Sequence, residues 1–288
     1  MNHRESTLTG ADGLNLYWQV WAPASEPGAV VVIAHGASEH SGRYVHVANR
    51  LVAEGYAVYA LDHRGHGRSE GPRALVDRID NVVADLDSLI VLAAAEHPGK
   101  DVFLLGHSMG GTVSLRYAIA HQDRLTGLIL SGPLAALEAA SPPVRVIAKV
   151  LSALTPRLPV VSIDSSLVSR DPAVVAAYVS DPLNYHGKLP ARTVAELAGA
   201  IESFPEGVGV ITIPTLIMYG TADGLCPPQG SVMLSERIGA VDKTLTPYEG
   251  LYHEILNEPE QQQVMDEICS WLAAHLEAVA SAGQTGSR

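Results

Sequence analysis

One serine in this chain stands where a nucleophile could be exposed, in the stretch Gly106-His107-Ser108-Met109-Gly110. The stretch follows an apolar run that predicts a buried strand, and it opens a helical pattern. Glycines two positions before and after the serine let a strand and a helix approach closely, which holds the serine on a sharp turn above a sheet. We therefore expect Ser108 to be a nucleophile rather than part of a plain glycine-rich turn.

A serine hydroxyl is a weak nucleophile at neutral pH, so it needs a base and a carboxylate that orients the base. Asp223 follows a predicted strand at 215–219, and His253 follows the next one at 244–248. Taken alone, Asp223 would be interpreted as a turn residue and His253 as a solvated loop histidine. The chain order Ser, Asp, His and the place of both residues at carboxyl ends of strands predict a catalytic triad.

The tetrahedral intermediate of such a reaction needs hydrogen-bond donors for its negatively charged oxygen. The backbone N–H of Met109, directly after the serine, is the first predicted donor. The second is the N–H of Ala37, in the loop that follows the strand at 29–34. Both roles belong to the main chain, so substitution tests them only indirectly.

The strands and helices that position these residues alternate along the chain. The predicted strands are 14–21, 29–34, 57–61, 102–106, 125–131, 215–219 and 244–248, and the predicted helices are 44–54, 77–97, 109–121, 230–238 and 258–276. Several of the strands are near-continuous Val and Ile runs, which is typical of strands buried on both faces. The pattern predicts an α/β protein with a mostly parallel sheet.

The alternation breaks at Gly132-Pro133, and residues 134–205 carry helical patterns with prolines. We interpret 134–205 as a helical cap inserted into a core formed by 1–133 and 206–280, with 281–288 as a flexible tail. Residues 144–154 predict an unusually apolar helix. That helix either packs inside the cap or dips into a lipid interface.

Composition excludes some classes of function. Lys and Arg number 19 against 31 Asp and Glu, a formal charge of −12, which argues against binding nucleic acid or anionic lipid. Two cysteines form no disulfide framework, and neither a secretion signal nor a membrane span is visible, so we expect a cytoplasmic protein. Peripheral contact of the cap with a membrane or micelle and a homodimer are further expectations, while no metal or other cofactor is expected.

Four stretches resemble the monoacylglycerol lipase family of α/β-hydrolases, in particular its mycobacterial-type members, and the resemblance extends from about residue 14 to 276. The stretches are 35–44 (HGASEHSGRY), 61–69 (LDHRGHGRS), 106–111 (GHSMGG), and 252–254 (YHE) with 257–260 (NEPE). The resemblance implies an α/β-hydrolase fold with a mostly parallel, eight-stranded sheet. It also implies an esterase that splits monoacylglycerols into glycerol and a fatty acid through an acyl-enzyme.

The resemblance carries over the triad Ser108, Asp223 and His253 and the two oxyanion donors. It also gives Glu39 and Arg43 places near the glycerol end of the pocket, although both could instead be structural and pair with each other or with the loop 62–69. Asp62, His63 and His66 lack a metal-ligand pattern, and we interpret them as loop scaffolding.

Fold alone does not fix the substrate. A lysophospholipase, a general carboxylesterase and a peptidase of the same fold are therefore the alternative enzymes. A catalytically silent binding protein is the alternative from another class. It would be expected to lack a triad residue, and all three candidates are present in this chain.

Overall fold

The computed structural model describes residues 1–137 and 150–285, the last nine of them by their backbone alone. At its centre is an eight-stranded sheet with the order β1-β2-β4-β3-β5-β6-β9-β10. The β1–β2 and β2–β4 pairs are antiparallel and the others are parallel, which confirms the mostly parallel sheet. The strands are β1 (Asn2–Thr9), β2 (Asn15–Ala22), β3 (Val30–Ala34), β4 (Ala57–Leu61), β5 (Val102–His107), β6 (Gly127–Ser131), β9 (Thr215–Gly220) and β10 (Lys243–Tyr248).

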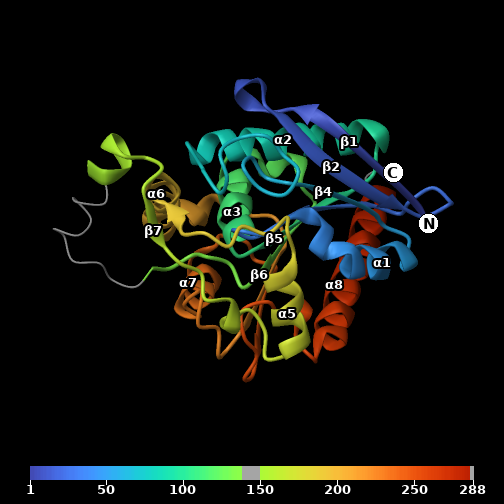
Figure 1. The fold of residues 1–288 in the computed structure, drawn as a ribbon. Helices are drawn as coiled ribbons and strands as arrows, with labels where there is room; N and C mark the ends of the chain where they lie inside the picture. Colours follow the sequence, from blue (N-terminus) through green and yellow to red (C-terminus); the bar gives the residue numbers. More distant parts are fainter. Residues whose placement is uncertain (138–149, 286–288) are drawn as a thin grey trace.

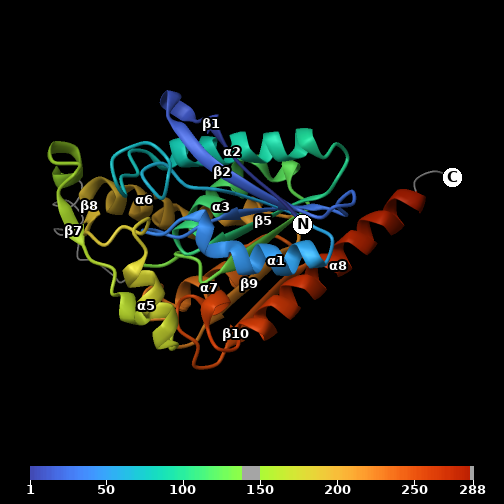
Figure 2. The ribbon, with the colours of Figure 1, turned by 45° about the vertical axis from the view of Figure 1, so that its right-hand side comes forward.

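Helices cover both faces of the sheet (Figures 1 and 2). One face packs against α2 (Ile79–Glu96), α3 (Met109–His121), α6 (Ala191–Gly207) and α7 (Gln229–Arg237), and the other against α1 (Val45–Ala53) and α8 (Gln261–Thr285). The chain thus folds into three layers, with the α/β-hydrolase fold that the resemblance implies.

The central strands belong to two hydrophobic clusters at once because successive side chains point to opposite faces of a sheet. In β3, Val30 and Val32 join the cluster beneath α2 and α3, whereas Val31 and Ile33 join the one beneath α1 and α8. All of these side chains are fully buried. Each such burial is worth roughly 1.5–3 kcal/mol, so the sheet is a rigid base for the loops at its carboxyl edge.

Both ends of the chain differ from the sequence prediction. β1 is a strand that the sequence pattern does not predict, because its residues are polar and almost all exposed and their conformation depends on pairing with β2. At the other end, α8 continues to Thr285 through a stretch predicted as a flexible tail from 281. The alanine-rich stretch 273–282 that leads into it favours a helix, and 286–288 lie outside the described residues.

Residues 134–205, which the sequence predicts to be a helical cap, contain helices and also two short strands that the sequence does not predict. β7 (Pro159–Val161) and β8 (Leu189–Pro190) form an antiparallel pair too short for a periodic pattern. The helix α5 (Pro172–Ser180) lies in the same segment and begins at the N-cap Asp171 with a proline in its first turn.

Two helices bear on the predicted cap, the one predicted at 144–154 and α6 at the predicted end of the cap. Of the apolar helix predicted at 144–154, residues 150–154 are helical and 144–149 lie outside the described residues. α6 crosses the boundary predicted at 205, and its buried residues Leu197, Ile201 and Phe204 belong to the core cluster. We therefore propose that the cap ends near 190. None of the helices in 1–137 and 150–285 is long and apolar enough to cross a membrane.

Candidate active site

Ser108 stands at the turn between β5 and α3, at the carboxyl edge of the sheet. Its backbone angles are φ 54° and ψ −120°, a conformation with positive φ that L-residues rarely adopt. Such strain persists only where the surrounding structure enforces it, and it occurs most often at functional positions. The turn thus holds the Ser108 side chain out of the helix and toward the cavity that it lines.

Two glycines make this turn sterically feasible. A Cβ atom on Gly110 would lie 2.0 Å from the Ala34 carbonyl oxygen, and one on Gly106 would lie 2.6 Å from the Gly110 carbonyl oxygen. These contacts are with backbone atoms of packed elements, which cannot move aside as a flexible side chain can. The glycine spacing around Ser108 is therefore a packing requirement of the crossing between α3, β3 and β5.

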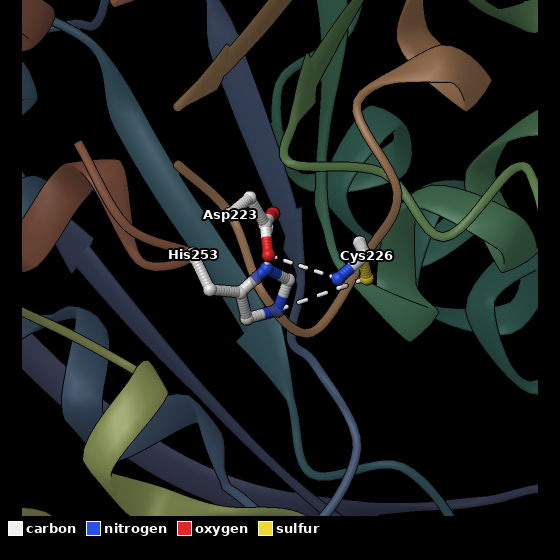
Figure 3. Close-up of side chains that lie close together, drawn as sticks. All are labelled: Asp223, Cys226 and His253. Atoms are coloured by element: carbon white, nitrogen blue, oxygen red, sulfur yellow. Dashed lines mark hydrogen bonds and ion pairs between the residues drawn. The ribbon is translucent and has the colours of Figure 1, made fainter. Parts of the chain in front are cut away.

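Asp223 and His253 form a buried hydrogen-bonded pair, although 30 positions separate them in the chain (Figure 3). Asp223 follows β9, His253 follows β10, and the His253 Nδ1–Asp223 Oδ2 distance is 2.7 Å. The other Asp223 oxygen accepts hydrogen bonds from the backbone N–H groups of Leu225 and Cys226, both at 2.8 Å. The carboxylate is thus fixed at both oxygens and holds the imidazole in one orientation.

The Cys226 thiol lies between the serine and the histidine. The Ser108 Oγ–Cys226 Sγ distance is 3.8 Å, and the Cys226 Sγ–His253 Nε2 distance is 4.0 Å. The structure thus brings the three sequence-predicted triad residues to one place, where Ser108 Oγ and His253 Nε2 both lie near the Cys226 sulfur and both residues line the same cavity. Rotation of the Ser108 side chain about its χ1 angle changes the distance between Oγ and His253 Nε2.

The surroundings of His253 make its imidazole a strong base. Burial disfavours the charged form, but the Cys226 sulfur and the Asp223 carboxylate outweigh burial and raise the pKa of His253 well above its ordinary value. A histidine that holds a proton this firmly can take one from a serine hydroxyl.

The two predicted oxyanion donors belong to different segments, Ala37 to the loop after β3 and Met109 to the start of α3. Ala37 lines the same cavity as Ser108, and Met109, the first residue of α3, has a backbone N–H without an acceptor inside the helix. The loop is held by Glu39, whose Oε1 accepts hydrogen bonds from the Gly36 N–H at 2.6 Å and the Tyr44 hydroxyl at 2.7 Å.

Arg43 joins Glu39 to the histidine loop. Its guanidinium donates to Glu39 Oε2 at 2.6 Å and to both Glu254 oxygens at 2.7 Å. Burial would raise the pKa of Glu39, but Arg43 and other neighbours hold that pKa below its ordinary value. All three side chains are nearly buried, and removal of one charged partner from such a group costs about 3–5 kcal/mol.

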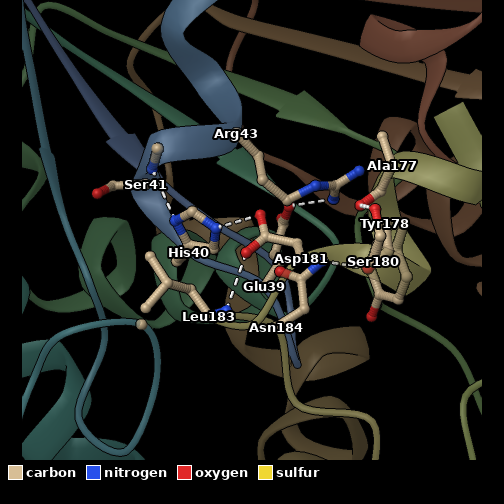
Figure 4. A network of polar contacts seen from close by, with 12 residues as sticks. Glu39, His40, Ser41, Arg43, Ala177, Tyr178, Ser180, Asp181, Leu183 and Asn184 are labelled. Carbon is tan, nitrogen blue, oxygen red and sulfur yellow. Dashed lines mark hydrogen bonds and ion pairs between the residues drawn. The ribbon is translucent and has the colours of Figure 1, made fainter.

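This network also reaches the cap (Figure 4). The Arg43 guanidinium lies over the Tyr178 ring of α5, 4.8 Å from its centre. A second connection joins His40 Nε2 to Asp181 Oδ2 at 2.9 Å, directly after α5. Glu39 is among the residues that line the cavity and Arg43 is not, and the ion pair between them agrees with the alternative in which the two residues pair with each other.

The cavity above Ser108 has a volume of about 260 Å³ and mostly apolar walls. Core and cap contribute to it together, with Glu39, Glu254 and Tyr178 at one polar region. The apolar walls are Leu134, Leu137, Val161, Ile163, Val168, Leu189, Val194, Leu197 and Leu225. Such a cavity suits an ester with a hydrocarbon chain and a small uncharged polar group.

The loop 62–69 is structural. Asp62 accepts hydrogen bonds from the backbone N–H groups of Ser41 and Arg68, both at 2.8 Å. His63 and His66 are buried, and burial lowers the pKa of His63 to about 3. These contacts agree with the scaffolding role predicted for the loop.

Sequence reasoning gave no role to Glu254 or Tyr178. Glu254 directly follows His253 in the sequence, but its partner Arg43 lies 211 positions earlier, and no local pattern predicts that pairing. Tyr178 belongs to α5, whose residues carry no motif.

Comparison with known proteins gives one consistent family. The family described as Serine aminopeptidase, S33 matches residues 25–260. The chain is 44% identical to the Monoacylglycerol lipase of Mycolicibacterium smegmatis over 94% of this chain and 98% of that protein. It is 38% identical to the human Monoglyceride lipase over 92% of this chain and 89% of that protein. The crystal structure of Paleococcus ferrophilus monoacylglycerol lipase, 34% identical, superposes with a TM-score of 0.81 over 90% of this chain and 99% of that one.

Proposed function

The chain belongs to the monoacylglycerol lipase family of α/β-hydrolases, and from this premise we propose that Ser108, Asp223 and His253 are the residues with which it hydrolyses monoacylglycerols to glycerol and free fatty acids. The observation that carries this assignment is the buried Asp223–His253 pair beside a strained serine at an apolar cavity.

In the proposed mechanism, His253 Nε2 takes the proton of Ser108 as Oγ attacks the ester carbonyl carbon. The N–H groups of Ala37 and Met109 stabilise the negative charge on the carbonyl oxygen. His253 then gives its proton to the leaving glycerol oxygen, and a water molecule activated by the same imidazole releases the fatty acid from Ser108. Asp223 keeps the Nδ1 proton in place throughout.

The cavity accounts for the two ends of the substrate. Each methylene moved from water to the apolar walls contributes about 0.8 kcal/mol, so the acyl chain supplies most of the binding and chain length is discriminated weakly. We propose that Glu39 faces the glycerol, and that Arg43 acts indirectly by holding Glu39 and Glu254 in place.

A substrate panel separates this activity from the related ones. None of the described residues that line the cavity is a lysine or an arginine, and the nearby Arg43 is already paired with two carboxylates, so this described part of the site offers no free cation to a lysophospholipid phosphate. We expect purified enzyme to hydrolyse monoacylglycerols at least about 100-fold faster, by kcat/KM, than lysophosphatidylcholine or an aminoacyl amide. Ser108→Ala protein is the blank. A preference for lysophosphatidylcholine or the amide would contradict the substrate assignment.

We also propose that the cap contacts lipid surfaces through a patch of exposed apolar residues, Leu137, Val150, Leu154, Leu158 and Val161. Leu137 and Val161 also line the cavity, so the patch adjoins the place where the substrate binds. Exposed apolar groups of this kind mark interaction surfaces. A homodimer stays a prediction, which light scattering of the purified protein would test.

Sedimentation with uncharged phosphatidylcholine vesicles tests the patch. Leu154→Glu and Leu158→Glu together should weaken vesicle binding about tenfold or more, because each lost leucine removes roughly 1.5–3 kcal/mol of burial. Val241→Glu is the matched control, since Val241 is as exposed as a residue can be but lies outside the cap. Equal binding of all three proteins would rule out this surface.

A further inference from the structure

Within the described part of the chain, one group of side chains has the atoms and the spacing of a metal site. Asp223, Cys226 and His253 each offer a ligand atom, and these atoms all lie within 4.8 Å of one another (Figure 3). All three residues are buried. The proposed mechanism uses the carboxylate and the imidazole but gives no role to the thiol.

The histidine of this group is oriented as zinc-binding histidines are. Its Nδ1 is bonded to Asp223, so the lone pair of the neutral ring is on Nε2, the nitrogen that lies 4.0 Å from Cys226 Sγ. Histidine ligands of zinc almost always donate their second N–H to a carboxylate or carbonyl oxygen, which fixes the ring and makes it a better ligand. The Asp223–His253 pair already has that arrangement.

The distances suit one ion between sulfur and nitrogen. Zinc bonds of about 2.3 Å to sulfur and about 2.0 Å to nitrogen at a tetrahedral angle place the two ligand atoms roughly 3.5 Å apart. The Cys226 Sγ–His253 Nε2 distance of 4.0 Å is therefore about half an ångström from the value required. The Ser108 hydroxyl, 3.8 Å from the same sulfur, lies on the adjoining side, and the cavity leaves room for water at the other positions.

We propose that Cys226 Sγ and His253 Nε2 form an inhibitory site for Zn²⁺, with Asp223 as the carboxylate that orients the histidine. As the metal–sulfur bond forms, the thiol releases its proton to solvent, and a protonated His253 releases its Nε2 proton before the lone pair of that nitrogen binds the metal; no oxidation state changes. A metal-bound Nε2 cannot accept the Ser108 proton. Zinc binding and ester hydrolysis therefore exclude each other.

Calorimetry with ZnCl₂ tests binding independently of catalysis. We expect full-length, tag-free Ser108→Ala protein to bind one Zn²⁺ per chain with release of protons from the two ligands. Adding Cys226→Ala, or the more conservative Cys226→Ser, should weaken binding about tenfold or more. Adding Cys269→Ala, which removes the other buried thiol from α8, should leave the affinity unchanged. Failure of Ser108→Ala to bind Zn²⁺, or unchanged affinity in both Cys226 variants, would overturn the site.

Hydrolysis rates test the inhibition. Zn²⁺ should inhibit the enzyme reversibly, with full recovery on adding EDTA, and the half-inhibiting concentration should rise about tenfold or more in Cys226→Ala. Each protein is compared with its own zinc-free rate, so a change in basal activity does not affect the comparison. Inhibition that is equal in Cys226→Ala and Cys269→Ala would contradict the proposal. If Ser108→Ala binds zinc and yet the unaltered enzyme hydrolyses no ester, the proposed function fails and the zinc site stands.

Discussion

Replacing Ser108 with alanine is expected to lower kcat for monoacylglycerol hydrolysis by roughly 10⁶, because no other group of the cavity replaces the hydroxyl that forms the acyl-enzyme. Binding of the substrate should change little, since the apolar walls that hold the acyl chain are untouched. The fold should also survive, because alanine keeps the same Cβ atom in the same strained turn. Steady-state hydrolysis and thermal unfolding measure the two effects.

Ser114→Ala is the matched control for this substitution. Ser114 is another buried serine, in α3, and its hydroxyl has no hydrogen-bond partner among the described residues. Its removal should leave hydrolysis within a few-fold of the unaltered enzyme. If Ser108→Ala kept more than about 1% of the activity while Ser114→Ala lost it, the nucleophile would have to be sought elsewhere.

Replacing Asp223 with asparagine is expected to lower kcat by about 10⁴, because an amide orients the imidazole less well and cannot stabilise its charged form. The pH dependence of the hydrolytic activity should also shift. In the unaltered enzyme the Asp223 carboxylate helps to raise the pKa of His253 against the effect of burial. Activity requires the neutral ring, so it falls as the pH drops through that pKa. Loss of the carboxylate lowers the pKa of His253, and the acid limb shifts to lower pH.

The profile of kcat/KM against pH measures this shift. Asp242→Asn is the control, because Asp242 also pairs with a histidine, His275 of α8, but is itself exposed and does not line the cavity. We expect Asp242→Asn to keep both the rate and the acid limb. An acid limb in Asp223→Asn that stays in place or moves to higher pH would show that the carboxylate does not act on the catalytic base.

The core elements could be predicted from sequence because their signals are local. β4 and α3 have the bounds that their apolar pattern predicts, since a strand buried on both faces and a helix that opens after a glycine-spaced turn carry their own sequence marks. The places of Asp223 and His253 follow from the same logic. Parallel strands bring their carboxyl ends to one edge, so residues just after β9 and β10 come near Ser108.

The parts that escaped prediction depend on partners far away in the chain. β1 is polar and is a strand because β2 pairs with it. Arg43 finds Glu254 only after the sheet has assembled, so the sequence could not decide between a substrate-binding and a structural role. The sequence also left open how close Cys226 lies to the catalytic residues, because its position between Ser108 and His253 depends on the path of the loop after β9.

The most direct measurement is the site at which a fluorophosphonate probe becomes attached to the intact enzyme, mapped by mass spectrometry of its peptides. Such probes react with a serine only when a base activates it, so the experiment reports on the nucleophile and the histidine together. We expect one probe per chain, on Ser108, with a reaction rate that falls steeply in Asp223→Asn. Attachment to a different residue, or equally fast reaction of Ser108 without the Asp223 carboxylate, would contradict the account.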